Sequence, residues 1–140
     1  MTFIDAGANI GLHTLAAGRA MQGAGKIVAF EPYGPTRELL SESVFMNGLS
    51  DIVEIHEAAV STKSGIQSLH LGKVSGHHSL YPLGDNGSAD GTSVPVRLVS
   101  LAEVISAGTR VDLIKIDVEG RNSMFCIVQD RSSNPTPKLP

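Results

Sequence analysis

The first eleven residues constrain the fold of this chain more than any other stretch. They read MTFIDAGANIG, an apolar run that ends at Asp5 and continues into a turn containing Gly7 and Gly11. A helical pattern follows, and a second apolar run, residues 27–30, then ends at the acid Glu31. Two apolar runs that each end in an acid, joined by a glycine turn and a helix, are typical of a nucleotide-binding βαβ unit. The sequence therefore predicts a cofactor site at this turn.

The glycine spacing of the turn disfavours a dinucleotide cofactor and hence a nicotinamide-dependent oxidoreductase. A dinucleotide site uses Gly-x-Gly-x-x-Gly, whereas this chain has Asn9 at the place of the second glycine. Asp5 would add negative charge near a pyrophosphate, but it suits a ligand that carries an ammonium group. S-adenosylmethionine carries an ammonium and a sulfonium and has no phosphate. We expect its carboxylate at the backbone amides that open the helix after Gly7, and its ribose diol at Glu31.

Four motifs follow one another along the chain: Phe3–Gly11 (FIDAGANIG), Ala29–Pro32 (AFEP), Glu57–Ser61 (EAAVS) and Val111–Gly120 (VDLIKIDVEG). In this order, and over residues 2 to about 120, they resemble the FkbM family of S-adenosylmethionine-dependent methyltransferases. The first two motifs are shared by many methyltransferases, and the KIDVEG block makes the combination specific. The resemblance implies an α/β, Rossmann-like class I methyltransferase fold with a parallel sheet. It also implies methylation of hydroxyl groups, often on sugars or polyketide-type small molecules.

The candidate site residues lie in these motifs. For S-adenosylmethionine they are Asp5, Gly7, Ala8, Asn9, Gly11, Glu31, Pro32, Ala58 and Ala59. The two alanines are small enough for an adenine ring to lie against them. Asp117 and Glu119 follow a predicted strand at the sheet edge where open α/β sheets bind ligands. Asp117 would act as a base toward a substrate hydroxyl or orient it, with Lys115 and Glu119 as supporting polar groups.

The histidines and the cysteine carry less weight as catalytic residues. His77 and His78 are adjacent, so in a strand they would point to opposite faces, and no third metal ligand accompanies them. We expect them in a substrate loop or a plain loop, and we expect no metal site. His13 fits an exposed helix position, and Cys126 has no histidine near it in sequence. The expected reaction is direct methyl transfer, in which catalysis consists mostly of positioning the two reactants.

Composition excludes several other classes of protein. At 140 residues, with 41% apolar and 18% charged residues, the chain suits one compact domain. Its net charge of −3, without a lysine or arginine cluster, gives no footprint for nucleic acid or an acidic membrane. Cys126 is the only cysteine, so no internal disulfide forms, and no apolar stretch approaches the length of a membrane span. We expect a soluble, cytoplasmic protein with a small-molecule partner; its oligomeric state stays open.

The hydrophobic pattern predicts a parallel sheet with right-handed crossovers. Four buried strands are expected, at Thr2–Ala6, Lys26–Phe30, Ile52–Ile55 and Val111–Ile116. Helices are expected at Ile10–Met21, Thr36–Met46 and Leu101–Ser106, the last with a capping box of Ser100 and Glu103. Their apolar faces would comprise Ile10, Leu15, Ala16 and Ala20 in the first helix, and Leu39, Leu40, Val44 and Phe45 in the second. Two further apolar runs, Ile66–Leu71 and Val94–Val99, flank a long loop or weakly paired hairpin connection at residues 72–93.

The pattern changes after Gly120. Residues 1–120 resemble an S-adenosylmethionine-binding domain that ends after the fourth core strand, whereas residues 121–140 predict an atypical, disordered tail. We therefore expect an open edge on the fourth strand and suspect a truncated product. The alternative to an active methyltransferase is an inactive fragment that binds the cofactor or a protein partner.

Overall fold

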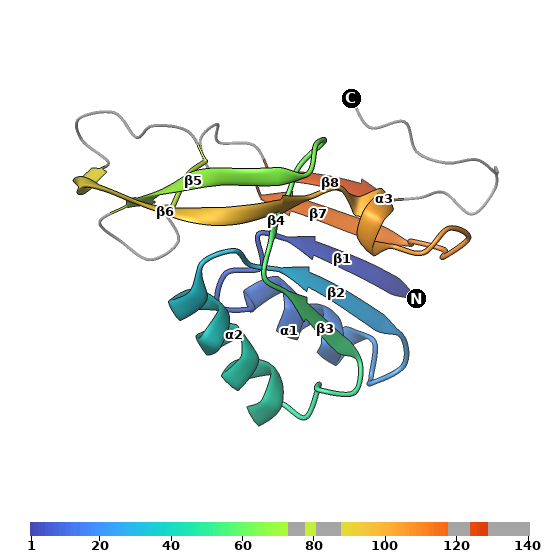
Figure 1. Cartoon of the computed structure of the whole chain (residues 1–140). Helices are drawn as coiled ribbons and strands as arrows, with labels where there is room; N and C mark the ends of the chain where they lie inside the picture. Colours follow the sequence, from blue (N-terminus) through green and yellow to red (C-terminus); the bar gives the residue numbers. More distant parts are fainter. Residues whose placement is uncertain (73–77, 81–87, 118–123, 129–140) are drawn as a thin grey trace.

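The computed structural model describes residues 1–72, 78–80, 88–117 and 124–128. Its elements are, in chain order, β1 (Thr2–Ala6), α1 (Leu12–Ala20), β2 (Lys26–Phe30), α2 (Gly34–Met46), β3 (Val53–His56), β4 (Ala59–Val60), β5 (Gly65–Gly72), β6 (Ser88–Val99), α3 (Leu101–Val104), β7 (Leu113–Asp117) and β8 (Met124–Val128). Strands and helices alternate from β1 to β3, as the sequence predicts (Figure 1). Within the described ranges, each helix is too short or too polar to cross a membrane.

The main sheet has the strand order β3-β2-β1-β7-β8. Strands β3, β2, β1 and β7 are parallel, which confirms the predicted α/β class. Ala6, the last residue of β1, is in register with Phe30 of β2 and with Ile116 of β7. The carboxyl ends of these three strands therefore meet at one edge of the sheet, where α/β folds bind their ligands.

Two apolar clusters hold the sheet to its neighbours. Helices α1 and α2 cover one face (Figure 1), where a cluster of Ala8, Ala29, Leu40, Val44 and Leu49 is buried. On the other face, the cluster comprises Ile4, Val28, Phe30, Ala58, Val99 and Ile114, and Leu101 and Val104 of α3 pack against it. Of the face predicted for α2, Leu40 and Val44 are buried, but Leu39 and Phe45 are exposed. The buried pair is spaced by four residues, which is one turn of the helix.

Helix α1 buries a different face from the one that its apolar residues predict. Leu15 is partly buried, but the other three members of that face are exposed: Ile10, Ala16 and Ala20. Thr14 and Gly18 are buried instead. The Thr14 hydroxyl turns inward because it donates a hydrogen bond to the Asp5 carboxylate. Gly18 is buried because it packs against Leu49. A Cβ atom at this position would lie 2.6 Å from a methyl carbon of Leu49, so the close contact requires a glycine.

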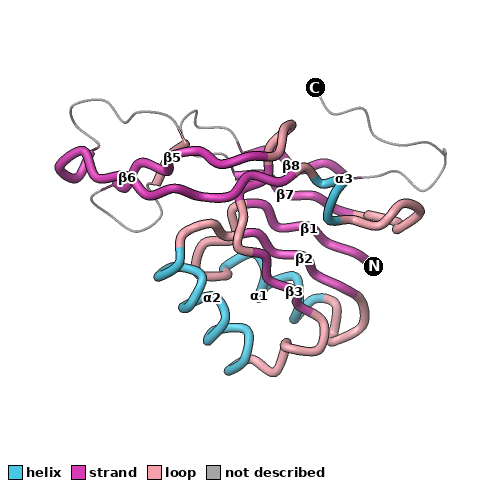
Figure 2. Tube along the Cα trace, in the orientation of Figure 1, coloured by secondary structure: helices cyan, strands magenta, loops and turns pink. Residues whose placement is uncertain are grey.

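A second sheet, with the order β4-β6-β5, lies beside the main one (Figure 2). Strands β5 and β6 are antiparallel, and Gly72 at the end of β5 pairs with Ser88 at the start of β6. Residues 88–93 thus belong to a strand that pairs with β5, as the hairpin alternative predicts, whereas residues 73–77 and 81–87 lie outside the described residues. Ser100 and Glu103 form the predicted capping box, although α3 ends at Val104 rather than at Ser106.

Strand β8 corrects the prediction of an open edge at the fourth core strand. Residues 124–128 (MFCIV) pair antiparallel with β7, from Leu113 opposite Val128 to Asp117 opposite Met124. The amides and carbonyls of β7 need partners on this side, and an apolar run of five residues supplies them. The predicted tail is therefore wrong at Met124–Val128. Residues 121–123 and 129–140 lie outside the described residues, so the prediction stays untested there.

Candidate functional site

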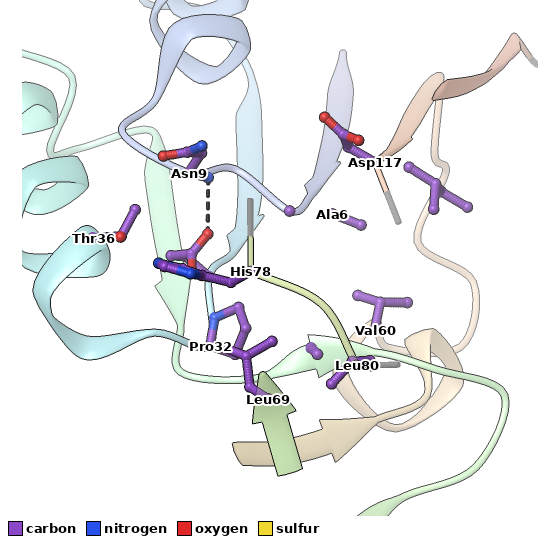
Figure 3. Close-up of a pocket in the computed structure, with 13 residues that line it drawn as sticks. Ala6, Asn9, Pro32, Thr36, Val60, Leu69, His78, Leu80 and Asp117 are labelled. Atoms are coloured by element: carbon purple, nitrogen blue, oxygen red, sulfur yellow. Dashed lines mark hydrogen bonds between the residues drawn. The ribbon is translucent and has the colours of Figure 1, made fainter. Parts of the chain in front are cut away.

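A cavity of about 120 Å³ opens at the carboxyl ends of β1, β2 and β7 (Figure 3). It is lined by Ala6, Gly7, Asn9, Glu31, Pro32, Thr36, Ala59, Val60, Leu69, His78, Leu80, Ile116 and Asp117. The predicted residues Gly7, Asn9, Glu31, Pro32, Ala59 and Asp117 are thus brought together around one space. Five others, Asp5, Ala8, Gly11, Ala58 and Lys115, do not line it, and Glu119 lies outside the described residues.

The turn between β1 and α1 owes its shape to three residues with positive φ. These are Gly7 (φ 77°), Asn9 (φ 52°) and Gly11 (φ 101°). Asparagine tolerates the left-handed region better than most residues, which explains how Asn9 stands where dinucleotide-binding turns have glycine. Gly11 lines no part of the cavity, because it packs against Leu40. Gly11 therefore contributes to the site only indirectly, because the absence of a side chain lets the turn approach α2.

The turn is fastened to the end of β2 by three backbone amides. Those of Gly7 and Ala8 both donate to the carbonyl oxygen of Phe30, at 3.0 and 2.9 Å. The amide of Asn9 donates to Oε2 of Glu31 at 3.0 Å, the dashed line in Figure 3. The amides of Gly7 and Ala8 are thus already paired within the protein, so the predicted carboxylate site would need amides farther along the turn or in α1.

Glu31 is a buried acid at the rim of this cavity, with only 7% of its surface exposed. Besides the Asn9 amide, it accepts the amide of Tyr33 on Oε1 at 2.9 Å. Burial raises the pKa of its carboxyl above the ordinary value of 4.5, although both amide hydrogen bonds and the nearby Arg37 act in the opposite direction. Each oxygen has a lone pair beyond its amide bond, so the carboxylate can still accept a ligand hydroxyl.

Asp5 does not face the cavity, and this corrects its predicted role toward a ligand ammonium. Its side chain is fully buried between the sheet and α1. There, Oδ2 accepts the Thr14 hydroxyl at 2.7 Å, and Oδ1 lies 3.1 Å from the ammonium of Lys115. Successive side chains of a strand point to opposite faces of the sheet, and register partners on neighbouring parallel strands point to the same face. Asp5 and its register partner Lys115 therefore both lie on the helix side of the sheet. The ammonium that Asp5 binds is thus the protein's own.

Asp117 lines the cavity from the end of β7, and 43% of its side chain is exposed. Its Oδ2 lies 3.8 Å from Nζ of Lys115, so it has a cation nearby while remaining open to a ligand. Ala58 is buried in the apolar core and Ala59 lines the cavity. Of the two predicted adenine contacts, only Ala59 therefore borders the space.

The hairpin supplies a wall that the sequence motifs do not reveal. Leu69 of β5 and Leu80 line the cavity, and so does His78. The His78 ring packs edge-on against Tyr33, with ring centroids 4.6 Å apart, and its Nδ1 accepts the amide of Gly72 at 3.1 Å. The pair His77-His78 in a polar stretch is the signal in the sequence, and it predicts a substrate loop or a plain loop. His77 lies outside the described residues.

The remaining candidates lie elsewhere. His13 is exposed on α1. Cys126, on β8, is in register with Lys115 on β7. Among the residues that the structure describes, no three histidine, cysteine or acidic side chains come together as metal ligands. The described lining of the cavity contains two acids, Glu31 and Asp117, and neither lysine nor arginine. Such a lining favours a ligand with hydroxyls or positive charge over one with a pyrophosphate.

Comparisons with known proteins agree with this geometry. A family model described as the methyltransferase FkbM domain matches residues 5–123. The chain is also 28% identical, over 145 residues, to methyltransferase sdnD of Sordaria araneosa; the match covers 84% of this chain and 56% of that relative. The chain thus spans little more than half the length of this curated relative. No solved structure matches the chain.

Proposed function

This chain belongs to the FkbM methyltransferase family, and from that membership we propose that it binds S-adenosylmethionine and transfers the methyl group to a hydroxyl of a small molecule or sugar. The cofactor supplies an electrophilic methyl group on its sulfonium. The protein's part is to bind both reactants and to hold them in line, because positioning accounts for most of the catalysis in such a transfer.

Glu31 is the observation that carries this proposal. A ribose diol needs an acceptor at the end of β2, and the Glu31 carboxylate lies there, held by the amides of Asn9 and Tyr33. Because both of its oxygens are already fixed in place, it would bind a diol without first being ordered. Ala59, Leu69 and Leu80 give the same cavity an apolar wall suited to an adenine ring. The two acids of the lining fit a ligand that has a sulfonium and no phosphate.

Asp117 is the proposed catalytic residue. It is the acid of the cavity that lies on β7, and its side chain is the more exposed of the two. Its carboxylate would accept the hydrogen bond of an acceptor hydroxyl, orient the oxygen toward the methyl group and take up the proton. Glu119, two residues farther along, remains a proposed supporting group.

A non-catalytic function is the second candidate. The match covers 56% of the curated relative, so the activity of the whole relative is only a proposal for this chain. Acceptor pockets on such folds are built largely from loops and added segments. In this case the protein would bind the cofactor, or a protein partner, without turnover.

One experiment separates these functions. S-adenosylmethionine labelled in its methyl group is offered to the wild type and to Asp117→Asn, with a panel of sugars and hydroxylated polyketides, and both bound and transferred label are counted. An active methyltransferase transfers label in the wild type, and Asp117→Asn binds it equally but transfers it about 100-fold or more slowly. Binding without transfer in the wild type supports the non-catalytic function, and absence of binding contradicts the proposed cofactor.

A further inference from the structure

Lys115 is a buried cation beneath the cavity, with 5% of its surface exposed. It lies on β7, in register with Asp5 on the neighbouring strand β1. Buried lysines are rare because desolvating an ammonium costs several kcal/mol, typically about as much as a single ion pair returns. An ion pair alone is therefore a weak reason for Lys115 to be there.

The ammonium makes a second contact that an ion pair does not need. Nζ donates a hydrogen bond to the carbonyl oxygen of Gly7 at 2.8 Å, which is shorter than its 3.1 Å distance to Asp5. That carbonyl belongs to the same peptide unit as the amide of Ala8, and this amide donates to the carbonyl of Phe30 on β2. The peptide between Gly7 and Ala8 is thus held at both ends, from β7 and from β2.

The held peptide directly precedes the residue that binds Glu31. Asn9 follows it, and the Asn9 amide donates to Oε2 of Glu31. Because a peptide unit is planar, rotation of the Gly7–Ala8 plane would redirect the chain that enters Asn9. A hydrogen bond on the Gly7 carbonyl therefore bears on the direction of the Asn9 amide, and with it on the Glu31 carboxylate.

We propose that Lys115 is a positioning residue for the turn between β1 and α1: through the Gly7 carbonyl, it fixes the Gly7–Ala8 peptide in the orientation in which Asn9 and Glu31 match the cofactor. The inference rests on the proposed function of the site as a binding site for S-adenosylmethionine. Asp5 and Thr14 then serve to hold the ammonium in place rather than to contact the ligand.

Three variants and one control separate positioning from charge balance. Lys115→Met leaves the Asp5 carboxylate buried without its counter-charge, so it damages stability for either role. The double variant Asp5→Asn, Lys115→Met removes both charges and the Gly7 contact together. Asp5→Asn alone leaves the buried ammonium without its nearest carboxylate but keeps the Gly7 contact. Lys26→Met is the control, because Lys26 is a half-exposed lysine whose partner is Glu54, on the far end of the sheet from the turn.

The first measurement is the affinity for S-adenosylhomocysteine, together with the melting temperature of each variant. We expect the double variant to melt higher than Lys115→Met, yet to bind about tenfold or more weakly than the wild type, as loss of a charged hydrogen bond implies. Asp5→Asn keeps the Gly7 contact and should lose less affinity than Lys115→Met, and Lys26→Met should bind within about threefold of the wild type. Wild-type affinity in the double variant, or a loss in Asp5→Asn as large as in Lys115→Met, would overturn the proposal.

The second measurement needs no cofactor. Amide hydrogen exchange of residues 8–11 is followed in the free proteins, and it should be faster in Lys115→Met and in the double variant than in Lys26→Met. Exchange that is equal in all three would refute a positioning role for Lys115. If the wild type binds no S-adenosylhomocysteine, the proposed function fails, and this exchange experiment still decides whether Lys115 holds the turn.

Discussion

The backbone carbonyl oxygen of Asp117 lies 2.6 Å from the point that a Cβ atom on Gly7 would occupy. The turn between β1 and α1 and the end of β7 therefore touch backbone to backbone, and the contact leaves no room for a side chain. Asp117 is the proposed catalytic residue, and Gly7 lines the same cavity. This contact therefore fixes the distance between Asp117 and the turn that contains Gly7.

Gly7→Ala should destabilise the protein and disrupt the site. The new methyl group adds a conformational cost of about 1–2 kcal/mol at φ 77°. Its clash with the Asp117 carbonyl adds about 1–3 kcal/mol, because neither backbone can move without separating β1 from β7. Urea denaturation measures the sum, about 2–5 kcal/mol in the free energy of unfolding.

Gly23→Ala is the matched control for Gly7→Ala. Gly23 has nearly the same φ, 75°, but a Cβ atom there would meet nothing within 4 Å. It should therefore show the conformational cost alone, about 1–2 kcal/mol. If the two variants lose equal free energy of unfolding, the close approach at Asp117 has no energetic consequence and this interpretation is wrong.

Glu31→Ala should weaken the binding of S-adenosylhomocysteine far more than Glu38→Ala, which removes an exposed acid from α2. A carboxylate that accepts a ribose hydroxyl makes a charged hydrogen bond worth about 1.5–3 kcal/mol, or about ten- to a hundredfold in affinity. Fluorescence or calorimetric titration gives the two dissociation constants. Equal values would mean that Glu31 is not a ligand contact.

The pH dependence of Glu31 should have opposite signs for stability and for binding. Burial raises its pKa above 4.5 in the folded protein, so the group favours the folded state at low pH, and this contribution is lost as the pH rises through the raised pKa. Relative to Glu31→Gln, the wild type should thus lose free energy of unfolding across this window. Its affinity for S-adenosylhomocysteine should increase over the same window, because the ionised carboxylate is the better acceptor. A stability difference that is constant with pH would contradict the argument.

Removal of residues 121–140 should lower the melting temperature and promote self-association, because β7 would lose its five register partners on β8. A chain that ends after Val128 is the control, since it keeps the strand. Thermal denaturation and size-exclusion chromatography compare the two. If they melt together and both remain monomeric, pairing with β8 contributes nothing to the fold.

The α/β class and the four parallel strands were predictable from two patterns. Buried parallel strands read as apolar runs, as residues 27–30 do, and β3, which is only partly buried, reads as the alternation VEIH. Strand β8 was not predictable in this way, because a five-residue apolar run has no periodicity that distinguishes a strand from a segment of a helix. The buried face of α1 was not predictable for another reason. Thr14 is buried by its hydrogen bond to Asp5, and a hydropathy pattern does not register such a partner.

The site was predictable where main-chain geometry defines it. Gly7, Asn9 and Glu31 follow from the motif because the turn demands positive φ and the strand end presents the acid. Asp5 was misjudged because its partner Lys115 is 110 residues away in sequence and meets it only through strand register. His78 lines the cavity because of the position of the hairpin. Local sequence patterns do not predict how a hairpin packs over a neighbouring sheet.

The central claim is that this cavity binds S-adenosylmethionine rather than a dinucleotide, and titration calorimetry of the wild type tests it most directly. S-adenosylhomocysteine and NAD are injected separately into the same preparation at the same pH. We predict a saturable heat with S-adenosylhomocysteine and none with NAD, since the described lining offers two acids and no lysine or arginine for a pyrophosphate. Saturable binding of NAD without binding of S-adenosylhomocysteine would contradict the account.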